Sequence, residues 1–414
     1  MSEDITPEFY KRYLLEDVLP FWIQHGWDRE QGGMWTCLDR DGTLLDSDKS
    51  VWFQGRAGWM FATMFNTVEA NPQWLEVAQS CVDFLDRCAD FTDSCDDSTD
   101  QAGSATSLSH TLSHCSGEAV PKLYFTVTRD AKPLRMRRYY YSESFAAIAY
   151  AAMAKATGVD RYHQAAVRML EVFLRSILDK SNAEPKTDPR TRPLRGIGPW
   201  MIAMATAQEL RANLGDVAVY GKSCSEWIDR CIEEIDQSFF KRELGALMEV
   251  VGSNGEVLDH FDTRQLNPGH AIECAWFILH ESRIRSDARL RKLGLDILDC
   301  MWQRGWDQQY GGLFYFRDVY DKPVQEYWHD MKFWWPHCEA IIATALAWKL
   351  TGDQKYQRMH ADVHAWSFEH FADREFGEWY GYLHRDGRKS NTLKGSTWKG
   401  PFHLPRMLWY CAQL

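Results

Sequence analysis

Two ionisable side chains stand at the start of an otherwise apolar segment, NPGHAIECAWFI at residues 267–278. His270 and Glu273 are three residues apart, a spacing that places both on one face of a helix. Histidine titrates near neutral pH and can both accept and donate a proton. A histidine at a single helix start is more often a packing residue than a catalyst, so a functional role is favoured only if the pattern recurs.

The pattern recurs in other apolar segments of the chain. His337 and Glu339 lie near the start of the stretch FWWPHCEAII, and His403 and Arg406 lie near the start of PFHLPRMLWYC. The comparable positions of two further segments hold Arg56, and Ser142 with Glu143. Histidines at equivalent places in a repeat, with carboxylates and arginines beside them, predict a polar pocket where several helix starts converge.

These residue types suit proton transfer next to a carbonyl group. Two histidines on opposite walls of a pocket can remove a carbon-bound proton from one face of a substrate and deliver a proton to the other. Glu273 or Glu339 can orient an imidazole or bind sugar hydroxyls. Arg56 or Arg406 can stabilise negative charge on an enolate oxygen. The set therefore favours epimerisation or isomerisation.

Other chemistries fit these residues less well. Three histidines and a glutamate can bind zinc, but the chain has no HExxH motif and we predict no metal site. An inverting glycosidase needs two carboxylates about 6.5–9.5 Å apart; Glu273 and Glu339 can serve, but the histidines would then have no role. The chain has no G-x-x-x-x-G-K-[ST] loop, so nucleotide hydrolysis has no motif.

The elements that must position these residues form an internal repeat. Three stretches run from an aspartate through polar residues and a glycine into an alternating apolar run and then a polar turn, and an apolar segment of the kind described above follows each. Alternation predicts a short strand, and the Asp and Gly residues predict tight turns. The three stretches are GWDREQGGMWTCLDRDG (26–42), GWDQQYGGLFYFRDVYD (305–321) and FADREFGEWYGYLHRDG (371–387).

Looser copies complete a set of six units. Amphipathic segments with apolar residues at helical spacing, such as 74–88 and 162–178, lie between the units. Six outer helices and six inner helices, joined by turns or hairpins, predict an all-α (α/α)6 barrel. We expect residues 1–414 to form one catalytic domain, a closed toroid of six helical hairpins with short β-hairpins on one face; a pair of three-hairpin helical domains is the alternative. The looser copies are at 122–132, 191–210 and 241–256.

Composition narrows the class of protein. A net charge of −11 argues against a nucleic-acid partner, which needs clustered Lys and Arg. Nineteen tryptophans offer flat faces that suit a sugar ring. Eleven cysteines without CxxC pairs predict reduced thiols, and the chain has neither a signal-peptide pattern nor an apolar run near the roughly 20 residues of a membrane span. We expect a cytoplasmic protein with a small-molecule sugar substrate.

One segment departs from the repeat. Residues 90–121 are rich in Ser, Thr, Asp and Gly and contain few large apolar groups. Such a composition cannot bury enough surface to offset the entropy of ordering, so we predict a mobile surface insertion. His110 and His114 lie within it and are assigned no site.

The motifs NPGHAIE, KFWWPHCEA, FGEWYGYLHRDG and KGPFHLPR resemble the N-acylglucosamine 2-epimerase family, which includes the renin-binding proteins. The resemblance spans nearly the whole chain and implies an (α/α)6 barrel that interconverts N-acetyl-D-glucosamine and N-acetyl-D-mannosamine. It implies that His270 and His403 are the catalytic pair and that Arg56 and Glu339 hold the substrate or its enediolate. It also implies a homodimer, and ATP as an allosteric activator that is not consumed, so that no cofactor is required for the chemistry.

Two departures from the family pattern bear on the implied substrate and on the implied role of ATP. The family's glutamate before the Trp pair is replaced by Trp328, in QEYWHDMKFWW, which bears on sugar specificity. The 90–121 insertion lies just before the region that the family associates with ATP. Mannose isomerase and cellobiose 2-epimerase activities, and a non-catalytic binding role, remain as alternatives.

Overall fold

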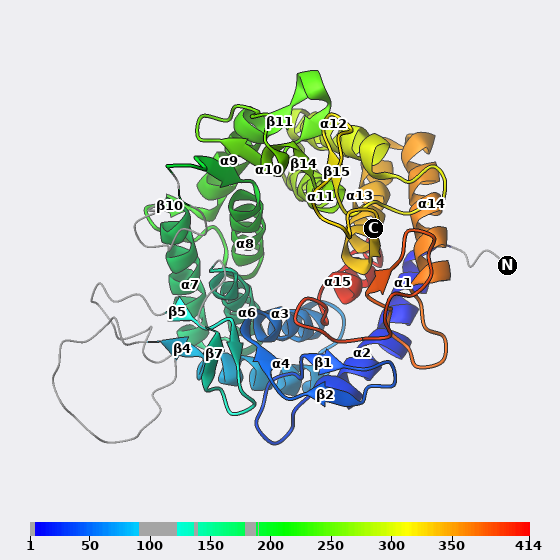
Figure 1. Cartoon of the computed structure of the whole chain (residues 1–414). Helices are drawn as coiled ribbons and strands as arrows, with labels where there is room; N and C mark the ends of the chain where they lie inside the picture. Colours follow the sequence, from blue (N-terminus) through cyan, green and yellow to red (C-terminus); the bar gives the residue numbers. More distant parts are fainter. Residues whose placement is uncertain (1–4, 91–121, 136–139, 179–187, 189) are drawn as a thin grey trace.

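The inner wall of the molecule is a ring of helices (Figure 1). The computed structural model describes residues 5–90, 122–135, 140–178, 188 and 190–414, so apart from residue 90 the insertion predicted at 90–121 lies outside the described residues. Within the described residues, successive inner helices pack against one another around a central space. They are α3 (Val51–Thr67), α6 (Tyr141–Thr157), α8 (Gly198–Leu214), α11 (Pro268–Arg285), α13 (Trp334–Thr351) and α15 (His403–Cys411).

An outer layer of helices packs against this wall. The outer helices are α4 (Pro72–Leu85), α7 (Asp160–Leu178), α9 (Cys224–Glu234), α12 (Ala288–Gly305) and α14 (Gln354–His370). The N-terminal segment α1 (Pro7–Tyr13), η1 (Leu14–Val18), α2 (Leu19–Phe21) and η2 (Trp22–Gly26) completes the outer layer, with α1 against α15. This is the (α/α)6 barrel that the repeat predicts.

The two layers differ in sequence because they differ in burial. Every residue of α13 from Trp334 to Ala347 is buried, since one side of the helix meets the outer layer and the other meets the barrel interior. Helix α13 is therefore apolar all round, whereas an outer helix has one apolar face. In α7 the buried residues recur at three- and four-residue intervals, as in Ala165, Ala166, Met169, Leu170 and Phe173.

Most of the short antiparallel strands precede an inner helix, and four of the nine strand pairs among the described residues join consecutive units. The strand just before α13, for example, pairs with a strand after α14 through Lys332↔Leu383. The predicted hairpins within units are thus supplemented by pairing between units. The pairs are β1 (Cys37–Leu38) with β2 (Leu44–Asp46), β3 (Lys49–Ser50) with β6 (Thr126–Val127), β6 with β7 (Pro133–Arg135), β4 (Ala89–Asp90) with β5 (Lys122–Leu123), β8 (Leu194–Gly196) with β13 (Val250–Gly252), β9 (Ala218–Val219) with β10 (Lys222–Ser223), β11 (Phe240–Lys241) with β12 (Ala246–Leu247), β14 (Gln265–Leu266) with β15 (Arg317–Asp318), and β16 (Lys332–Phe333) with β17 (Tyr382–Leu383). The remaining short elements are η5 (Ile235–Phe239), η6 (Arg242–Leu244) and α10 (Phe261–Arg264).

A buried ion cluster recurs beside these strands. Asp307 accepts hydrogen bonds from Lys332 Nζ at 3.1 Å and from Arg385 Nε at 2.8 Å, and Lys332 also donates to the carbonyl of Gly312. Asp307 and Lys332 are almost fully buried, and Arg385 comes from the turn of the following unit. Each cluster therefore ties one unit to the next. The equivalent clusters are Asp28 with Lys49 and Arg129, and Asp373 with Lys394 and Arg40.

Candidate active site

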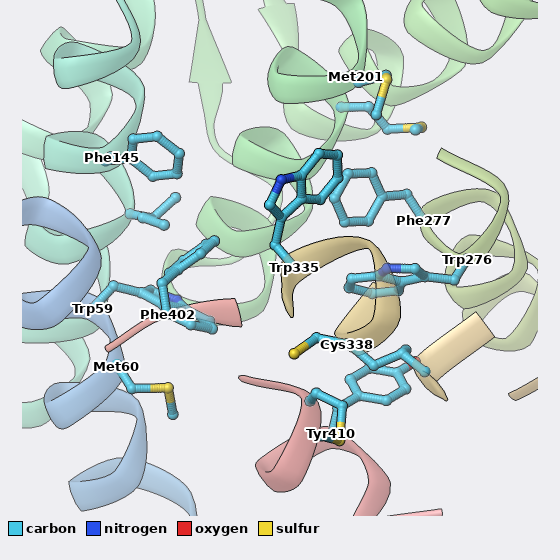
Figure 2. Packing of buried hydrophobic residues seen from close by; sticks show 14 of the residues in the cluster. Trp59, Met60, Phe145, Met201, Trp276, Phe277, Trp335, Cys338, Phe402 and Tyr410 are labelled. Atoms are coloured by element: carbon cyan, nitrogen blue, oxygen red, sulfur yellow. The ribbon is translucent and has the colours of Figure 1, made fainter. Parts of the chain in front are cut away.

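The ring encloses a cavity of about 1370 Å³, lined by the first turns of the inner helices and by later turns of α8, α11 and α15. Figure 2 shows the aromatic side chains that project into this space, among them Trp335 and Phe402. The predicted site residues that line the cavity are Arg56, His270, Glu273, His403 and Arg406. Glu339 lies directly behind them, in contact with His403. The structure thus brings together six of the nine residues that the sequence places at the converging helix starts.

His403 is the first residue of α15 and is oriented by a carboxylate. Its Nδ1 lies 2.7 Å from Glu339 Oε1, and the Trp276 indole N–H donates to the other oxygen of Glu339 at 2.7 Å. A carboxylate accepts hydrogen bonds, so Nδ1 carries the proton and Nε2 is left as the basic nitrogen of the neutral ring. Burial lowers the pKa of His403 well below its usual value, and the charges of Arg56 and Arg406 lower it further. His403 is therefore neutral near pH 7 and is suited to accept a proton.

His270 is also oriented by a carboxylate, but its pKa is shifted in the opposite direction to that of His403. Asn267 caps α11 by accepting from the His270 backbone N–H at 3.1 Å, which fixes the start of the helix. The His270 Nδ1 lies 3.0 and 3.1 Å from the two oxygens of Glu249. Burial lowers the pKa of His270, but Glu249, with smaller contributions from Glu273 and Glu339, outweighs it, so the pKa is raised. His270 is therefore the better proton donor of the two histidines.

Trp335 makes ring contacts with both histidines. Its indole centroid lies 4.9 Å from that of His270 and 5.7 Å from that of His403, with interplanar angles of 36° and 41°. The two imidazoles therefore share one rigid aromatic neighbour on α13. This contact limits the freedom of both rings, which proton transfer at a fixed carbon atom requires.

Arg406 connects the carboxylates of the site. Its Nη2 donates to Glu273 Oε1 at 2.6 Å and to Glu339 Oε1 at 2.7 Å, and lies 3.4 Å from His403 Nδ1. Glu273, Glu339 and His403 also present three potential metal-ligand atoms within 4.8 Å of one another. The guanidinium already forms an ion pair with both carboxylates, so a cation would have to compete with it.

Arg56 has a different environment. Its guanidinium lies over the rings of Trp52, Phe145 and Phe402 at 4.8, 4.2 and 4.8 Å from their centroids. Its Nε is buried and has no hydrogen-bond partner among the described residues. Burial lowers the pKa of Arg56 to about 9, so the side chain is still charged at neutral pH. An unpaired cation in an aromatic cavity wall is available to an anionic oxygen of a ligand.

His337 does not belong to this site, contrary to the sequence prediction. Its Nδ1 lies 2.6 Å from the carbonyl oxygen of Phe333, and its Nε2 accepts from the backbone N–H of Leu313 at 2.9 Å. The ring is fully buried and stacks on Trp366, and burial lowers its pKa to about 3. Position 337 faces the outer layer because it lies between Trp335 and Glu339, which face the interior.

Ser142 and Glu143 also serve the local structure. Glu143 accepts from the backbone N–H of Leu123 at 2.8 Å, and Ser142 donates to the carbonyl of Tyr124 at 3.1 Å. Both therefore attach the segment around β5 to the first turn of α6. Equivalent positions in the repeat can thus hold either site residues or structural ones.

Sequence reasoning missed Glu249, and it did not predict the position of Trp335. Glu249 lies between β12 and β13, 21 residues before His270, so no helical spacing connects the two. The available signal was the alternation in GALMEVVGS, which predicts a strand but not its neighbour. At the cavity edge the structure places Trp328 together with Glu326, two residues before it.

The chain is similar to known proteins over most of its length. The family model described as N-acylglucosamine 2-epimerase (GlcNAc 2-epimerase) matches residues 32–403. The chain belongs to this family. It is 34% identical to the N-acylglucosamine 2-epimerase of Bos taurus, over 97% of this chain and 89% of the relative, and 34% identical to that of Homo sapiens, over 97% and 88%.

A solved structure shares the fold. The cellobiose 2-epimerase of Bacillus thermoamylovorans superimposes with a TM-score of 0.78 at 18% identity, covering 98% of both chains. Family membership makes the chain an enzyme of the epimerase and isomerase class. None of the described helices combines the length and apolarity that a membrane span needs.

Proposed function

We propose that the protein interconverts N-acetyl-D-glucosamine and N-acetyl-D-mannosamine by proton transfer at C2 of the open-chain sugar. The observation that carries the proposal is the matched pair His270 and His403: both line one cavity, both have Nδ1 against a carboxylate, and both contact Trp335. The identity to the two mammalian relatives supports the choice of substrate.

The two histidines have complementary roles in this mechanism. The C2 proton of an open-chain aldose is acidic because its removal gives an enediolate whose charge rests on O1. Neutral His403 accepts the C2 proton from one face, and protonated His270 delivers a proton to the opposite face, which inverts C2. In the reverse direction the roles exchange. Environments that push two pKa values apart are the usual sign of such a division of labour.

Two arginines stabilise charge at different places. The buried Nε of Arg56 has no hydrogen-bond partner among the described residues, and the side chain is positioned to stabilise the enediolate oxygen. Arg406 is paired with Glu273 and Glu339, so its role is to hold the carboxylate that orients His403. Glu273 lines the cavity and is available to sugar hydroxyls as well.

Proton NMR of the purified protein with N-acetylmannosamine in D2O tests the proposal. Appearance of N-acetylglucosamine with deuterium at C2 is expected. Conversion of mannose to fructose in a parallel sample, without reaction of the N-acetyl sugar, would contradict the substrate assignment and make Trp328 the first residue to exchange for glutamate. Absence of exchange from both sugars would contradict an epimerase function towards these monosaccharides.

The accompanying properties are part of the proposal. Two histidines and an arginine supply the acid, base and charge stabilisation, so we propose that the chemistry requires neither a metal nor a cofactor. ATP is proposed to act at most as an activator, which a parallel NMR sample with ATP tests. A homodimer is proposed from the family resemblance and a cytoplasmic location from the cysteine usage. Light scattering of the purified protein measures its oligomeric state.

A further inference from the structure

We propose that Glu249 is a positioning residue of this reaction, which fixes the ring of His270 and retains on it the proton that is delivered to C2. The inference rests on the proposed function, because it concerns the histidine assigned there as proton donor. Glu249 itself is not assigned contact with the reacting atoms.

The geometry around Glu249 supports a fixed orientation. Both carboxylate oxygens lie within 3.1 Å of His270 Nδ1, so the ring is held by two acceptors. The backbone at Glu249 is held in turn: its carbonyl accepts from the Ile197 N–H at 3.0 Å, and the next residue, Val250, pairs with Gly196. The carboxylate is thus anchored to the strand that leads into α8, while His270 is anchored to α11 by Asn267. Anchoring on regular elements is what holds an imidazole within the small tolerance of proton transfer.

Glu249 and Glu339 are similar in position but differ in charge balance. Glu339 accepts from Arg406 and Trp276 as well as from His403, so its negative charge is shared. Among the described residues, the ion pair of Glu249 is with His270 alone. His270 therefore faces a carboxylate that pairs with it alone, and His403 faces a carboxylate that also pairs with Arg406. This asymmetry adds to burial and to the charge of Arg56, which lower the pKa of His403, so that His270 holds a proton more tightly than His403.

Other charges also act on His270, and the predicted pH dependence must include them. Glu249 is the one in hydrogen-bond contact, and its effect on the His270 pKa is larger than that of the other carboxylates. Because the histidines also influence one another, the pH profile belongs to the pair. Other titratable or charged groups around the site include Glu273 on α11, Glu339 on α13, Tyr315 and Glu326 before α13, Arg195 on β8, Asp262 on α10, Arg56 on α3, and His403 and Arg406 on α15.

The proposal predicts a specific change in the pH profile. In both directions of the reaction, the transition state contains the two histidines and one proton for transfer. kcat/KM therefore falls at alkaline pH, when His270 loses that proton. Removing the charge of Glu249 lowers the pKa of His270, and the alkaline limb moves to lower pH. The shift is expected to be about one pH unit or more. The shift is the same for the forward and the reverse reaction, because the ratio of their kcat/KM values equals the equilibrium constant.

The experiment compares three substitutions with a control. Glu249→Gln keeps the size and an acceptor for Nδ1–H but removes the charge; it should shift the alkaline limb and leave the acidic limb in place. Glu249→Ala also frees the ring and should lower kcat by a further factor of about ten. Glu249→Asp restores the charge at a longer distance and should place the alkaline limb between those of the wild type and Glu249→Gln. Glu243→Gln, on the exposed face of η6, should match the wild type.

A second measurement does not depend on turnover. NMR titration of protein with 13C-labelled histidine, with His270→Gln used to assign the resonance, reports the pKa of His270 directly. Glu249→Gln should lower it. An unchanged His270 titration and an unchanged alkaline limb in Glu249→Gln would overturn the proposal. If the wild type does not exchange the C2 proton of N-acetylmannosamine, the proposed function fails, while the titration still decides the role of Glu249.

Discussion

Arg40 and Asp373, 333 residues apart in the chain, form a two-point ion pair: Arg40 Nε lies 2.7 Å from Asp373 Oδ2, and Arg40 Nη2 lies 3.0 Å from Oδ1. Arg40 belongs to the first repeat unit and Asp373 to the last. The pair therefore closes the ring on the face that carries the strands, where the histidines also lie. Trp409 and Thr67 provide a second closure, with the indole N–H donating to the hydroxyl at 2.9 Å.

Replacing Asp373 with asparagine should destabilise the fold. The substitution removes the carboxylate that forms an ion pair with the fully buried Lys394, and loss of one member of a buried ion pair costs about 3 kcal/mol or more. Thermal unfolding measures the loss. Asp386→Asn, which breaks a surface pair with Arg388, is the matched control and should leave the melting temperature unchanged. Equal effects of the two substitutions would contradict a ring-closing role for Asp373.

The same cluster predicts how stability depends on acid. Burial alone would raise the pKa of Asp373, but the hydrogen bond from Arg40 and the charge of Lys394 outweigh it and hold the pKa well below its usual range. A lowered folded-state pKa contributes stability that is complete above the unfolded value of about 3.9 and is lost as the pH falls below it. The free energy of unfolding should therefore fall below about pH 4, and less steeply in Asp373→Asn. Chemical denaturation at several pH values measures both slopes.

The repeat in the sequence was enough to predict the barrel, since six apolar inner helices and amphipathic outer ones leave few ways to bury their faces. It was also enough to bring His270 and His403 into one site, because equivalent positions of a ring face the same axis. The repeat wrongly placed His337 in the site. His337 lies two residues from Trp335 along the helix, and this rotation turns it from the cavity to the outer layer. The repeat could not find Glu249, because strand pairing across units creates that contact and local spacing carries no trace of it.

His337 should be structural. His337→Phe keeps the ring that stacks on Trp366 but leaves the N–H of Leu313 without its acceptor, which costs about 1–3 kcal/mol. We expect a lower melting temperature with kcat/KM per folded molecule unchanged. A large loss of kcat/KM in fully folded His337→Phe would show that the residue contributes to the reaction after all.

Arg56 should act on the transition state. Arg56→Met removes a buried charge whose Nε has no hydrogen-bond partner among the described residues, so the fold should lose little stability. Loss of the cation at the enediolate oxygen should lower kcat by about 10²–10³, with a smaller change in KM. Steady-state kinetics and thermal unfolding of the same preparation separate the two effects. A change confined to KM would assign Arg56 to ground-state binding.

The wild-type pH profile should be broad. Burial and the charges of Arg56 and Arg406 lower the pKa of His403, whereas Glu249 raises that of His270 against the effect of burial. kcat/KM should fall at acid pH, when His403 is protonated, at a value well below the usual 6.5 or so of histidine. It should fall at alkaline pH, when His270 loses its proton, above that value. Two limbs that both fall near pH 6.5 would contradict the asymmetry between the histidines.

Single-histidine variants should separate proton removal from epimerisation. In His270→Asn, His403 can still exchange the C2 proton of the epimer whose C–H bond faces it, but no acid remains on the other side to invert the centre. In His403→Asn the other epimer should exchange instead. Epimerisation should fall by about 10³ or more in both variants. NMR of each pure epimer in D2O measures exchange and inversion separately, and exchange of the same epimer by both variants would contradict histidines on opposite faces of C2.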